Sequence, residues 1–587
     1  MEEFKEFMRG YTSITPYMGR YKKTRRTSII ATFIGTIFEL LIPVSLGLMI
    51  DGVSSNKPIN QTLLIGVVMI IFAIISMLVS MRATKYAAIT STGFAANLRE
   101  LQFRKIQTFA FDDIEHFGIP SLLTRITSDM QLASRSTFMT TRFLVRTMLT
   151  ALLAFILSVV VSPRLSMIFL VSAPLLIFGI MYITSKSIPM FKQSRDQYDN
   201  LTMVAEENIS NIRVVKSFVR ESFEIKKFYK QNQGMFKLSD RANGIISLIF
   251  PMTNLIMFST IAVIVWFGSK EIAKGNMTVG DLISFNMYSL QLLGAFIGMS
   301  TSFTVLMSAS AGISRVSELV HYTPSMNNDE KIEELELEDG SVDFDNVSFS
   351  YDEDSDNYSL QDVNLHIKSG ESIGIMGPTG SAKSSLVQLI PRLYDITEGS
   401  LRVGGHDIKE YPLKTLREEV AIVLQKNTLF SGTIKENIRW GDENATDEEI
   451  FKIAEIACVD EFVRERADGY DSILGQGGAG VSGGQKQRIC IARSLLKKPK
   501  ILILDNSTSA VDTKTEKRMI DNINEYSKNL TKIIISQRTS SFIDCDRIIM
   551  MKDGKINDIG SHEDLYKRNE VYRRIYDVQN KDRDIDE

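Results

Sequence analysis

Apolar residues in the first half of the chain fall into runs, each about as long as a membrane-spanning helix. The runs cover residues 28–50, 62–81, 146–162, 165–183, 245–267 and 279–307. A helix needs about 20 apolar residues to cross about 30 Å of hydrocarbon. Buried helices of a large soluble protein are the alternative, and six runs that are mostly free of charge make it the weaker interpretation. We therefore expect an all-α transmembrane domain of six helices over residues 1–320.

Basic residues set the expected orientation of these helices. Five of them stand at positions 20–26, before the first run, whereas residues 51–61 contain only Lys57. The positive-inside rule then places the N-terminus in the cytoplasm. The charged segments 82–142 and 185–243 follow on the same side. We expect them to extend the membrane helices into the cytoplasm and to make mechanical contact with a domain there.

One carboxylate, Glu39, interrupts the first apolar run. A charged group at this depth is costly, so it should face a cavity or a partner. Two interpretations stay open: a contact for a substrate or proton, and a polar lock between helices. The many Met and Phe residues of the runs are compatible with an adaptable apolar cavity, although simple packing is the more frequent role of such residues.

The pattern changes after the last apolar run. Residues 321–340 are polar and acidic and are typical of a linker, residues 341–580 alternate strand-like and helix-like stretches, and residues 581–587 form a charged tail. Within the middle part a strand, a glycine-rich loop and a helix follow one another. The loop nearly matches G-x-x-x-x-G-K-[ST] with Gly377, Pro378, Thr379, Gly380, Ser381, Ala382, Lys383 and Ser384. Such a loop cradles phosphates with its backbone N–H groups and holds Mg²⁺ with its hydroxyl, which predicts an α/β domain that binds ATP and Mg²⁺.

A second glycine-rich element supports the first. Ser482, Gly483, Gly484 and Gln485 open a predicted helix, whose N-terminus would attract an anion. A simple helix cap explains this element taken singly. It does not explain two phosphate-type loops together with an apolar strand that ends in Asp505, all in one domain.

Composition adds little and excludes some classes. The net charge of −3 gives no basic footprint, so no nucleic-acid partner is expected. The mean hydropathy of +0.01 averages two unlike halves. The three cysteines show no CxxC spacing and are expected to be reduced thiols, and the N-terminus lacks the pattern of a cleaved signal peptide.

In combination these motifs resemble the ATP-binding cassette exporters in their half-transporter form, over essentially the whole chain. The resemblance is carried by FDDIEHFGIPSLLTRITSD, NISNIRVVKSFVRE, VLQKNTLFSGTIKENI, VSGGQ, ILILDNSTSAVD and SQR. It implies a phosphate loop that extends to Ser385, a Tyr351 that stacks on adenine, and an Mg²⁺ site with Ser384, Gln425 and Asp505. It also implies that residues 482–485 close over ATP held by the opposite subunit, that Asp512 lies in the loop between the two sites, and that residues 112–117 and 209–213 are coupling helices.

Four positions depart from the family. Asn506 stands where a Glu follows the metal-side Asp, Gln537 replaces the switch His, Ala382 replaces a phosphate-loop Gly, and Gln476 replaces a Glu before the signature loop. Neither amide is a general base, so hydrolysis at this chain's own site should be poor. Three departures lie at that site, whereas the signature loop at residues 482–485 is intact.

This asymmetry favours the degenerate half of a heterodimeric exporter in the cell membrane, with its N-terminus and ATP-binding domain in the cytoplasm. A homodimeric exporter with two impaired sites and an ATP-gated regulatory membrane subunit are the alternatives. A change introduced at Asn506 or Ala382 to trap ATP would give the same residues. Family prevalence favours multidrug export of a small amphipathic or lipid-like substrate, which the sequence does not identify.

Overall fold

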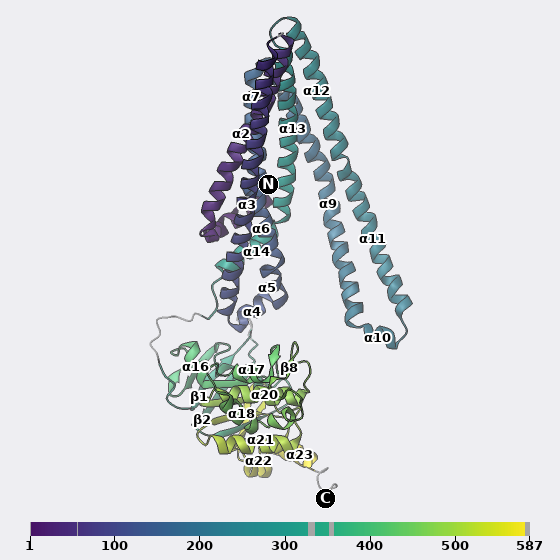
Figure 1. Ribbon diagram of the computed structural model, residues 1–587. Helices are drawn as coiled ribbons and strands as arrows, with labels where there is room; N and C mark the ends of the chain where they lie inside the picture. Colours follow the sequence, from purple (N-terminus) through teal and green to yellow (C-terminus); the bar gives the residue numbers. More distant parts are fainter. Residues whose placement is uncertain (1, 56, 327–334, 352–356, 581–587) are drawn as a thin grey trace. The chain divides into compact units, whose positions relative to one another are not determined.

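The computed structural model describes residues 2–55, 57–326, 335–351 and 357–580, and it divides into two compact units (Figure 1). The first unit comprises Met1–Gln107 and Ile119–Tyr322. The second comprises Thr108–Gly118 and Thr323–Glu587. A short segment from the first half of the sequence therefore belongs to the second unit, and each unit is described by itself.

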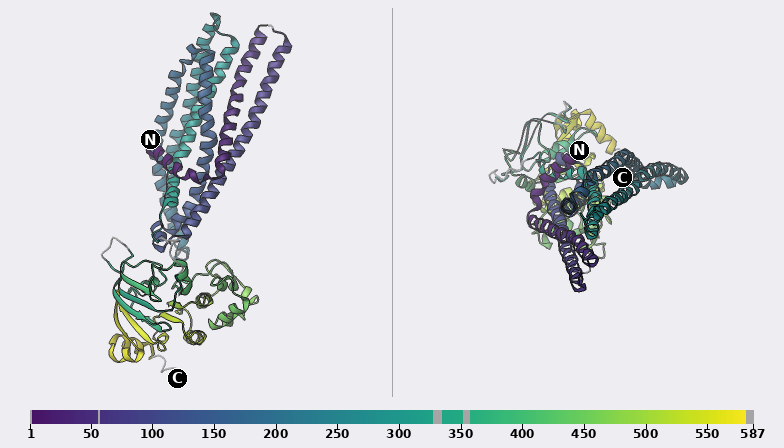
Figure 2. Two further views of the ribbon diagram at one scale, coloured as in Figure 1. Left: turned by 90° about the vertical axis from the view of Figure 1, so that its left-hand side faces the viewer. Right: turned by 90° about the horizontal axis from the view of Figure 1, so that it is seen from above.

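The described secondary structure of the first unit is all helical, and Figure 2 shows that it consists mainly of long helices. The helices are α1 (Glu2–Ile14), α2 (Tyr21–Ser54), α3 (Ile59–Gln107), α5 (Ile119–Ile126), α6 (Ser128–Phe138), α7 (Val145–Val161), α8 (Pro163–Ser166), α9 (Phe169–Ser210), α10 (Ile212–Ser217), α11 (Glu221–Ser247), α12 (Ile249–Ala273), α13 (Val279–Ser308) and α14 (Ser310–His321), with a 3₁₀ turn at Thr15–Met18 and a π-helical turn at Met139–Leu144.

Six stretches of the described residues are long and apolar enough to cross a membrane, which confirms the six predicted spans. They are Tyr21–Ser54, Ile59–Gln107, Ile119–Val161, Pro163–Ser210, Glu221–Ala273 and Val279–Ser308. Their apolar side chains are widely exposed, as expected of residues that face lipid.

The starts of two short helices are clear in the structure. Pro163 is the first residue of α8, and the Ser162 hydroxyl accepts a hydrogen bond from the Leu165 N–H at 3.4 Å. The second predicted coupling helix begins at Ile212 and not at residue 209, since α9 continues to Ser210. No residue of α10 is buried.

The second unit is built on a six-stranded sheet of order β12-β11-β3-β10-β9-β6. All neighbours in it pair in parallel except β11 and β12. A four-stranded antiparallel sheet of order β2-β1-β4-β5 and a β7-β8 pair complete the strands. Their bounds are β1 (Val342–Phe349), β2 (Leu360–Ile367), β3 (Ser372–Met376), β4 (Glu398–Val403), β5 (His406–Asp407), β6 (Val420–Val423), β7 (Gly432–Thr433), β8 (Ile473–Leu474), β9 (Ile501–Asp505), β10 (Thr531–Ile535), β11 (Arg547–Lys552) and β12 (Lys555–Gly560).

Apolar side chains cover both faces of the parallel strands. Every residue of β9 is buried, and alternate residues belong to two clusters: Ile501 and Ile503 to one, Leu502 and Leu504 to the other. Burial on both faces explains why this strand is a continuous apolar run. The helices of the unit are α4 (Phe111–Phe117), α15 (Lys383–Leu389), α16 (Leu413–Glu419), α17 (Ile434–Arg439), α18 (Asp447–Ile456), α19 (Asp460–Val463), α20 (Gly483–Leu496), α21 (Thr513–Tyr526), α22 (His562–Arg568) and α23 (Glu570–Asn580).

Part of the predicted linker and all of the predicted tail lie outside the described residues. Between the end of α14 and the start of β1, residues 327–334 lie outside the described residues, as does the charged tail at 581–587. The three cysteines are free and buried, in accord with the expected reduced thiols.

Candidate nucleotide-binding site

The order of the parallel strands brings four predicted site segments to one edge of the sheet. In β3, β10, β9 and β6 the carboxyl ends share this edge, and Ile535 of β10 lies in register between Ile375 of β3 and Asp505 of β9. The phosphate loop, Gln537, Asn506 and Gln425 follow these strands in turn. Ligands of open α/β sheets bind at this edge, so the predicted phosphate, switch, base and metal positions are neighbours.

The phosphate loop has the backbone that its sequence requires, with one strained residue. A Cβ at Gly377 would lie 2.3 Å from the Met551 carbonyl oxygen, so only glycine fits there. Ala382 adopts φ +63° and ψ +26°, a left-handed conformation that disfavours an ordinary side chain. Its methyl group packs against an apolar cluster of the domain core. That contact argues against crowding of bound phosphates by the methyl group of Ala382.

A lysine, a hydroxyl and a carboxylate meet beside the loop. Lys383 Nζ donates hydrogen bonds to the carbonyl oxygens of Gly377 at 2.9 Å and Pro378 at 2.8 Å. Asp505 is 1% exposed, and its burial raises the pKa of the carboxyl group. The hydrogen bond from the Ser384 hydroxyl and the positive charge of Lys383 lower this pKa, but by less than burial raises it. Burial also lowers the pKa of Lys383, whereas the negative charge of Asp505 raises it.

These residues fit Mg²⁺-bound ATP. A hydroxyl and a carboxylate are the oxygen ligands that Mg²⁺ prefers, and this ion usually keeps several waters and binds substrate phosphates as well. Within the described part of the chain, no group of three or more His, Cys, Asp or Glu residues could hold a metal ion by itself. A metal shared between Ser384, Asp505 and the nucleotide is the arrangement that suits this donor set.

An aromatic chain connects the predicted adenine contact to α4, which belongs to the same unit. The hydroxyls of Tyr351 and Ser385 are 2.9 Å apart, and the Tyr351 ring meets the Tyr394 ring edge-on at 5.2 Å. The ring of Tyr394 in turn packs against the ring of Phe111, with 5.9 Å between the ring centroids. The Tyr394 hydroxyl donates a hydrogen bond to Glu115 Oε1 at 3.5 Å. Tyr351 is 47% exposed, which leaves surface to stack on a base.

Sequence reasoning missed Tyr394. Its one signal is an aromatic residue shortly after the phosphate-loop helix, and such residues usually only pack. The structure shows that it lies between the predicted adenine contact and the first predicted coupling helix, which is α4 at Phe111–Phe117.

The two amide departures lie where a base and a switch are expected. Asn506 has φ +49°, its N–H donates to the Ile535 carbonyl at 2.9 Å, and its side-chain Nδ2 donates to Asp505 Oδ1 at 3.5 Å. Gln537 is exposed, and its carbonyl accepts a hydrogen bond from Gln579 at 2.8 Å. Gln425 and Gln476 are also exposed. An amide can orient water but cannot take its proton.

The signature residues begin α20 and lie at the surface. Ser482 and Gln485 form a capping box: the Ser482 hydroxyl accepts from the Gln485 N–H at 3.3 Å, and the Gln485 side chain accepts from the Ser482 N–H at 3.0 Å. Ser482 and Gly483 are exposed. A Cβ at Gly484 would lie 2.6 Å from the Ala510 carbonyl oxygen, so the signature helix and the following loop pack without room for a side chain.

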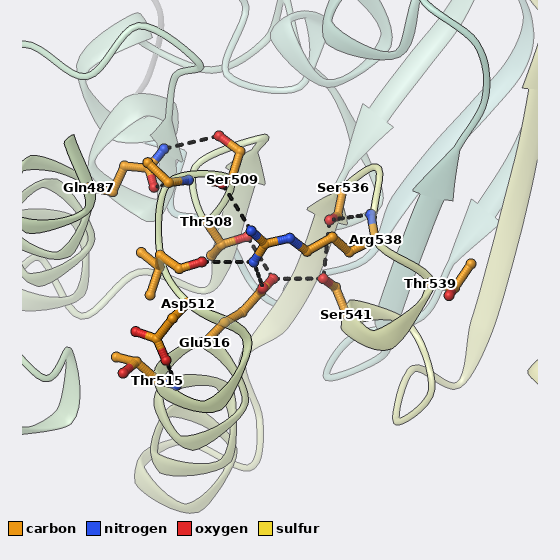
Figure 3. A network of polar contacts seen from close by, with 12 residues as sticks. Gln487, Thr508, Ser509, Asp512, Thr515, Glu516, Ser536, Arg538, Thr539 and Ser541 are labelled. Carbon is orange, nitrogen blue, oxygen red and sulfur yellow. Dashed lines mark hydrogen bonds and ion pairs between the residues drawn. The ribbon is translucent and has the colours of Figure 1, made fainter. Parts of the chain in front are cut away.

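Residues 507–512 form the loop that the resemblance predicts to lie between the two sites of a dimer; it is called the dimer loop below and is held by polar contacts (Figure 3). Gln487 of α20 accepts from the Ala510 N–H at 3.0 Å. Asp512 caps α21 by accepting from the Thr515 N–H at 2.9 Å, and this hydrogen bond lowers the pKa of Asp512.

Glu39 has an ion-pair partner in the first unit. One nitrogen of Arg146, at the start of α7, donates to both Glu39 carboxylate oxygens at 2.8 and 3.0 Å. The pair joins α2 to α7, which supports the polar lock over a free substrate contact.

Comparisons with known proteins agree on one family. Residues 26–296 match the ABC transporter transmembrane region, and residues 360–509 match the ABC transporter family. The uncharacterized ABC transporter ATP-binding protein YfiB of Bacillus subtilis (strain 168) is 34% identical over 544 residues, 92% of this chain and 94% of that protein. ABC transporter B family member 4 of Dictyostelium discoideum is 32% identical over 558 residues, 94% of this chain and 71% of that protein.

A solved structure agrees on the fold. The structure of a bacterial Atm1-family ABC exporter with ATP bound superposes with a TM-score of 0.82 at 22% identity and covers 95% of this chain and 98% of that one. Together with the six membrane-spanning helices and the α/β nucleotide site, these matches show that the chain belongs to the ABC transporter family and has the fold of an exporter half-transporter, a multi-pass membrane protein with a cytoplasmic ATP-binding domain.

Proposed function

We propose that this chain is the degenerate half of a heterodimeric ATP-driven exporter. Its own site binds Mg²⁺-bound ATP and hydrolyses it slowly, while its signature loop completes the site of a second, non-identical half-transporter. One observation carries the proposal: Asn506 and Gln537 follow adjacent strands beside the groups that suit Mg²⁺-bound ATP, which are Lys383, Ser384 and Asp505. The site therefore has groups that bind the nucleotide, whereas amides occupy the two positions where a base and a switch histidine are expected.

Binding and hydrolysis make different demands on this site. Binding needs the loop N–H groups, the Lys383 ammonium and oxygen ligands for Mg²⁺. Hydrolysis needs in addition a water that is aligned on the γ-phosphate and a group that orients or deprotonates it. The Asn506 amide can hydrogen-bond that water without accepting its proton, and Gln537 offers an amide in place of an imidazole. ATP is therefore held in the site for longer than it would be in a competent one.

The signature end supports service to a partner. ABC exporters act as dimers in the membrane, and Ser482 and Gly483 are exposed at the positive N-terminus of the 14-residue helix α20. Those N–H groups and the serine hydroxyl suit the charge that develops on a γ-phosphate presented by another subunit. A small amphipathic or lipid-like molecule is the proposed cargo, with Glu39 and Arg146 as a structural pair rather than its binding site.

The experiment is co-purification followed by transport. The tagged chain is expressed with a half-transporter that has Glu and His at the two positions matching Asn506 and Gln537, and ATP-dependent uptake is measured in inverted vesicles. We expect an equimolar complex of two unlike chains and uptake only when both are present. Full uptake by the chain alone would identify a homodimer. An equimolar complex that forms but shows no ATP-driven uptake of the amphipathic probes would identify a regulatory subunit.

A further inference from the structure

One buried carboxylate has no part in nucleotide binding as described above. Glu516 of α21 is 2% exposed, and it accepts hydrogen bonds from the Thr508 hydroxyl at 2.7 Å and the Ser541 hydroxyl at 2.6 Å (Figure 3). Arg538 Nη1 completes the set with a contact of 2.9 Å to the other carboxylate oxygen. Three donors on two different loops therefore converge on one side chain.

The arginine of this set directly follows the switch position. Its Nη1 also donates to the Val511 carbonyl at 2.7 Å, and its Nη2 donates to the Ser509 carbonyl at 3.1 Å. Its own N–H donates to the Ser536 hydroxyl at 3.0 Å. A single planar guanidinium thus binds Glu516 and two backbone carbonyls of the dimer loop, a geometry that the fork of five donors permits.

The two loops have different neighbours in the proposed function. The switch loop, residues 536–541, follows β10 at the edge where this chain's own ATP would bind. The dimer loop, residues 507–512, packs against the signature helix, with Ala510 against Gly484. A buried carboxylate is tolerated only when it is paired and hydrogen-bonded. A displacement of one loop therefore has to carry Glu516, Arg538 and the other loop with it.

We propose that Glu516 is a positioning residue that transmits occupancy of this chain's ATP site from the switch loop to the dimer loop. The inference rests on the proposed function and adds its regulation: ATP that is bound and not hydrolysed would set the position of the loop next to the signature helix. A site that has lost its base would keep this role, because the hydrogen bonds of Glu516 and Arg538 within the described residues go to groups other than Asn506.

Hydrogen–deuterium exchange of the full-length chain in lipid nanodiscs tests the inference, with Mg²⁺-bound ATP added or withheld and ATP binding measured separately. In the wild-type chain we expect ATP to slow exchange at residues 507–512 at least tenfold. In Glu516→Gln we expect that slowing to be lost while the dissociation constant of ATP changes less than threefold. Arg538→Lys, which keeps the charge but has one nitrogen instead of a fork, should lose it too, and it serves if Glu516→Gln does not fold.

A second ion pair of the same domain, which is partly buried, provides the matched control. Glu371 and Arg547 have side chains 10% and 32% exposed, against 3% and 36% for Glu516 and Arg538. Glu371 immediately precedes β3 and so lies at the opposite edge of the sheet from the loops. Glu371→Gln should therefore retain the ATP-induced slowing, although it too breaks a pair.

The possible outcomes distinguish a failure of the positioning role of Glu516 from a failure of the proposed function. ATP-induced slowing that persists in Glu516→Gln or Arg538→Lys, or that is equally lost in Glu371→Gln, would overturn the positioning role. The same holds if ATP binds to the wild-type chain and leaves residues 507–512 unchanged. A wild-type chain that binds no ATP would contradict the proposed function and the inference together, and the binding measurement reveals this by itself.

Discussion

Restoring a carboxylate at position 506 should raise hydrolysis only modestly by itself. A general base contributes about 10²–10⁴-fold when the remaining groups are positioned for it. The backbone of residue 506 opposes part of that gain, because φ +49° suits Asn better than Glu. A strain of about 1 kcal/mol corresponds to a factor of about five, since about 1.4 kcal/mol is tenfold.

The neighbours of residue 506 reduce the gain further. Asn506 Nδ2 donates to Asp505 Oδ1, and a glutamate would replace that donor with a second negative charge. The switch position would still carry Gln537, and groups that act as a unit are strongly non-additive. We therefore expect Asn506→Glu to raise kcat about tenfold at most, and Asn506→Glu with Gln537→His to raise it at least about tenfold more.

Phosphate release by the purified full-length chain alone at saturating ATP measures both effects, because no competent partner site then contributes to the rate. Asn506→Gln is the matched control, because Gln has the size of Glu and carries the same backbone strain without a proton acceptor. The control should stay at the parent rate. A double mutant no faster than the parent, or a control as fast as Asn506→Glu, would refute the assignment of residue 506 to the base position.

Three further predictions concern the signature loop, the metal ligand and the phosphate loop. Ser482→Ala should reduce the ATPase activity of the assembled heterodimer to background. Ser561→Ala removes an equivalent capping-box serine at α22 and should leave the ATPase activity unchanged, although each of the two substitutions costs about 1 kcal/mol of helix stability. Because burial raises the pKa of Asp505, this carboxylate should become protonated at a pH above its ordinary pKa of 3.8. Mg²⁺-dependent ATP binding, measured by calorimetry, should therefore weaken as pH falls through the raised pKa, and Asp505→Asn should remove this pH dependence. Ala382→Gly should change ATP affinity less than threefold and the free energy of unfolding by less than about 1 kcal/mol, because relief of the left-handed φ is offset by the lost methyl packing and the added chain entropy of glycine.

Much of the architecture could be predicted because each feature has a local cause. Six apolar runs of membrane length predicted six spans, since backbone groups in lipid have to be paired within a helix. The continuous apolar run at residues 501–504 predicted a strand that ends in Asp505, and the structure shows that this strand is buried on both faces. The resemblance to the exporter family then placed the candidate site residues.

Features that depend on packing between distant segments were not predictable. The assignment of Thr108–Gly118 to the second unit and the strand order β3-β10-β9-β6 are set by contacts between segments that are not neighbours in the sequence. Tyr394 and Glu516 have no local pattern that distinguishes them from core or helix-surface residues. Even Ala382, which the sequence shows as a departure, needed coordinates to reveal that its methyl group packs against the core.

The nature of the nucleotide that remains bound to this chain tests the central claim most directly. The full-length chain is purified, loaded with Mg²⁺ and ATP labelled on the α-phosphate, freed of excess nucleotide after several minutes, and its bound label is separated into ATP and ADP. A site with the binding groups Lys383, Ser384 and Asp505 and no proton acceptor should retain intact ATP, and Lys383→Ala should retain almost no label. Bound ADP together with turnover at the ~1–100 s⁻¹ of ordinary phosphoryl-transfer enzymes would contradict the account.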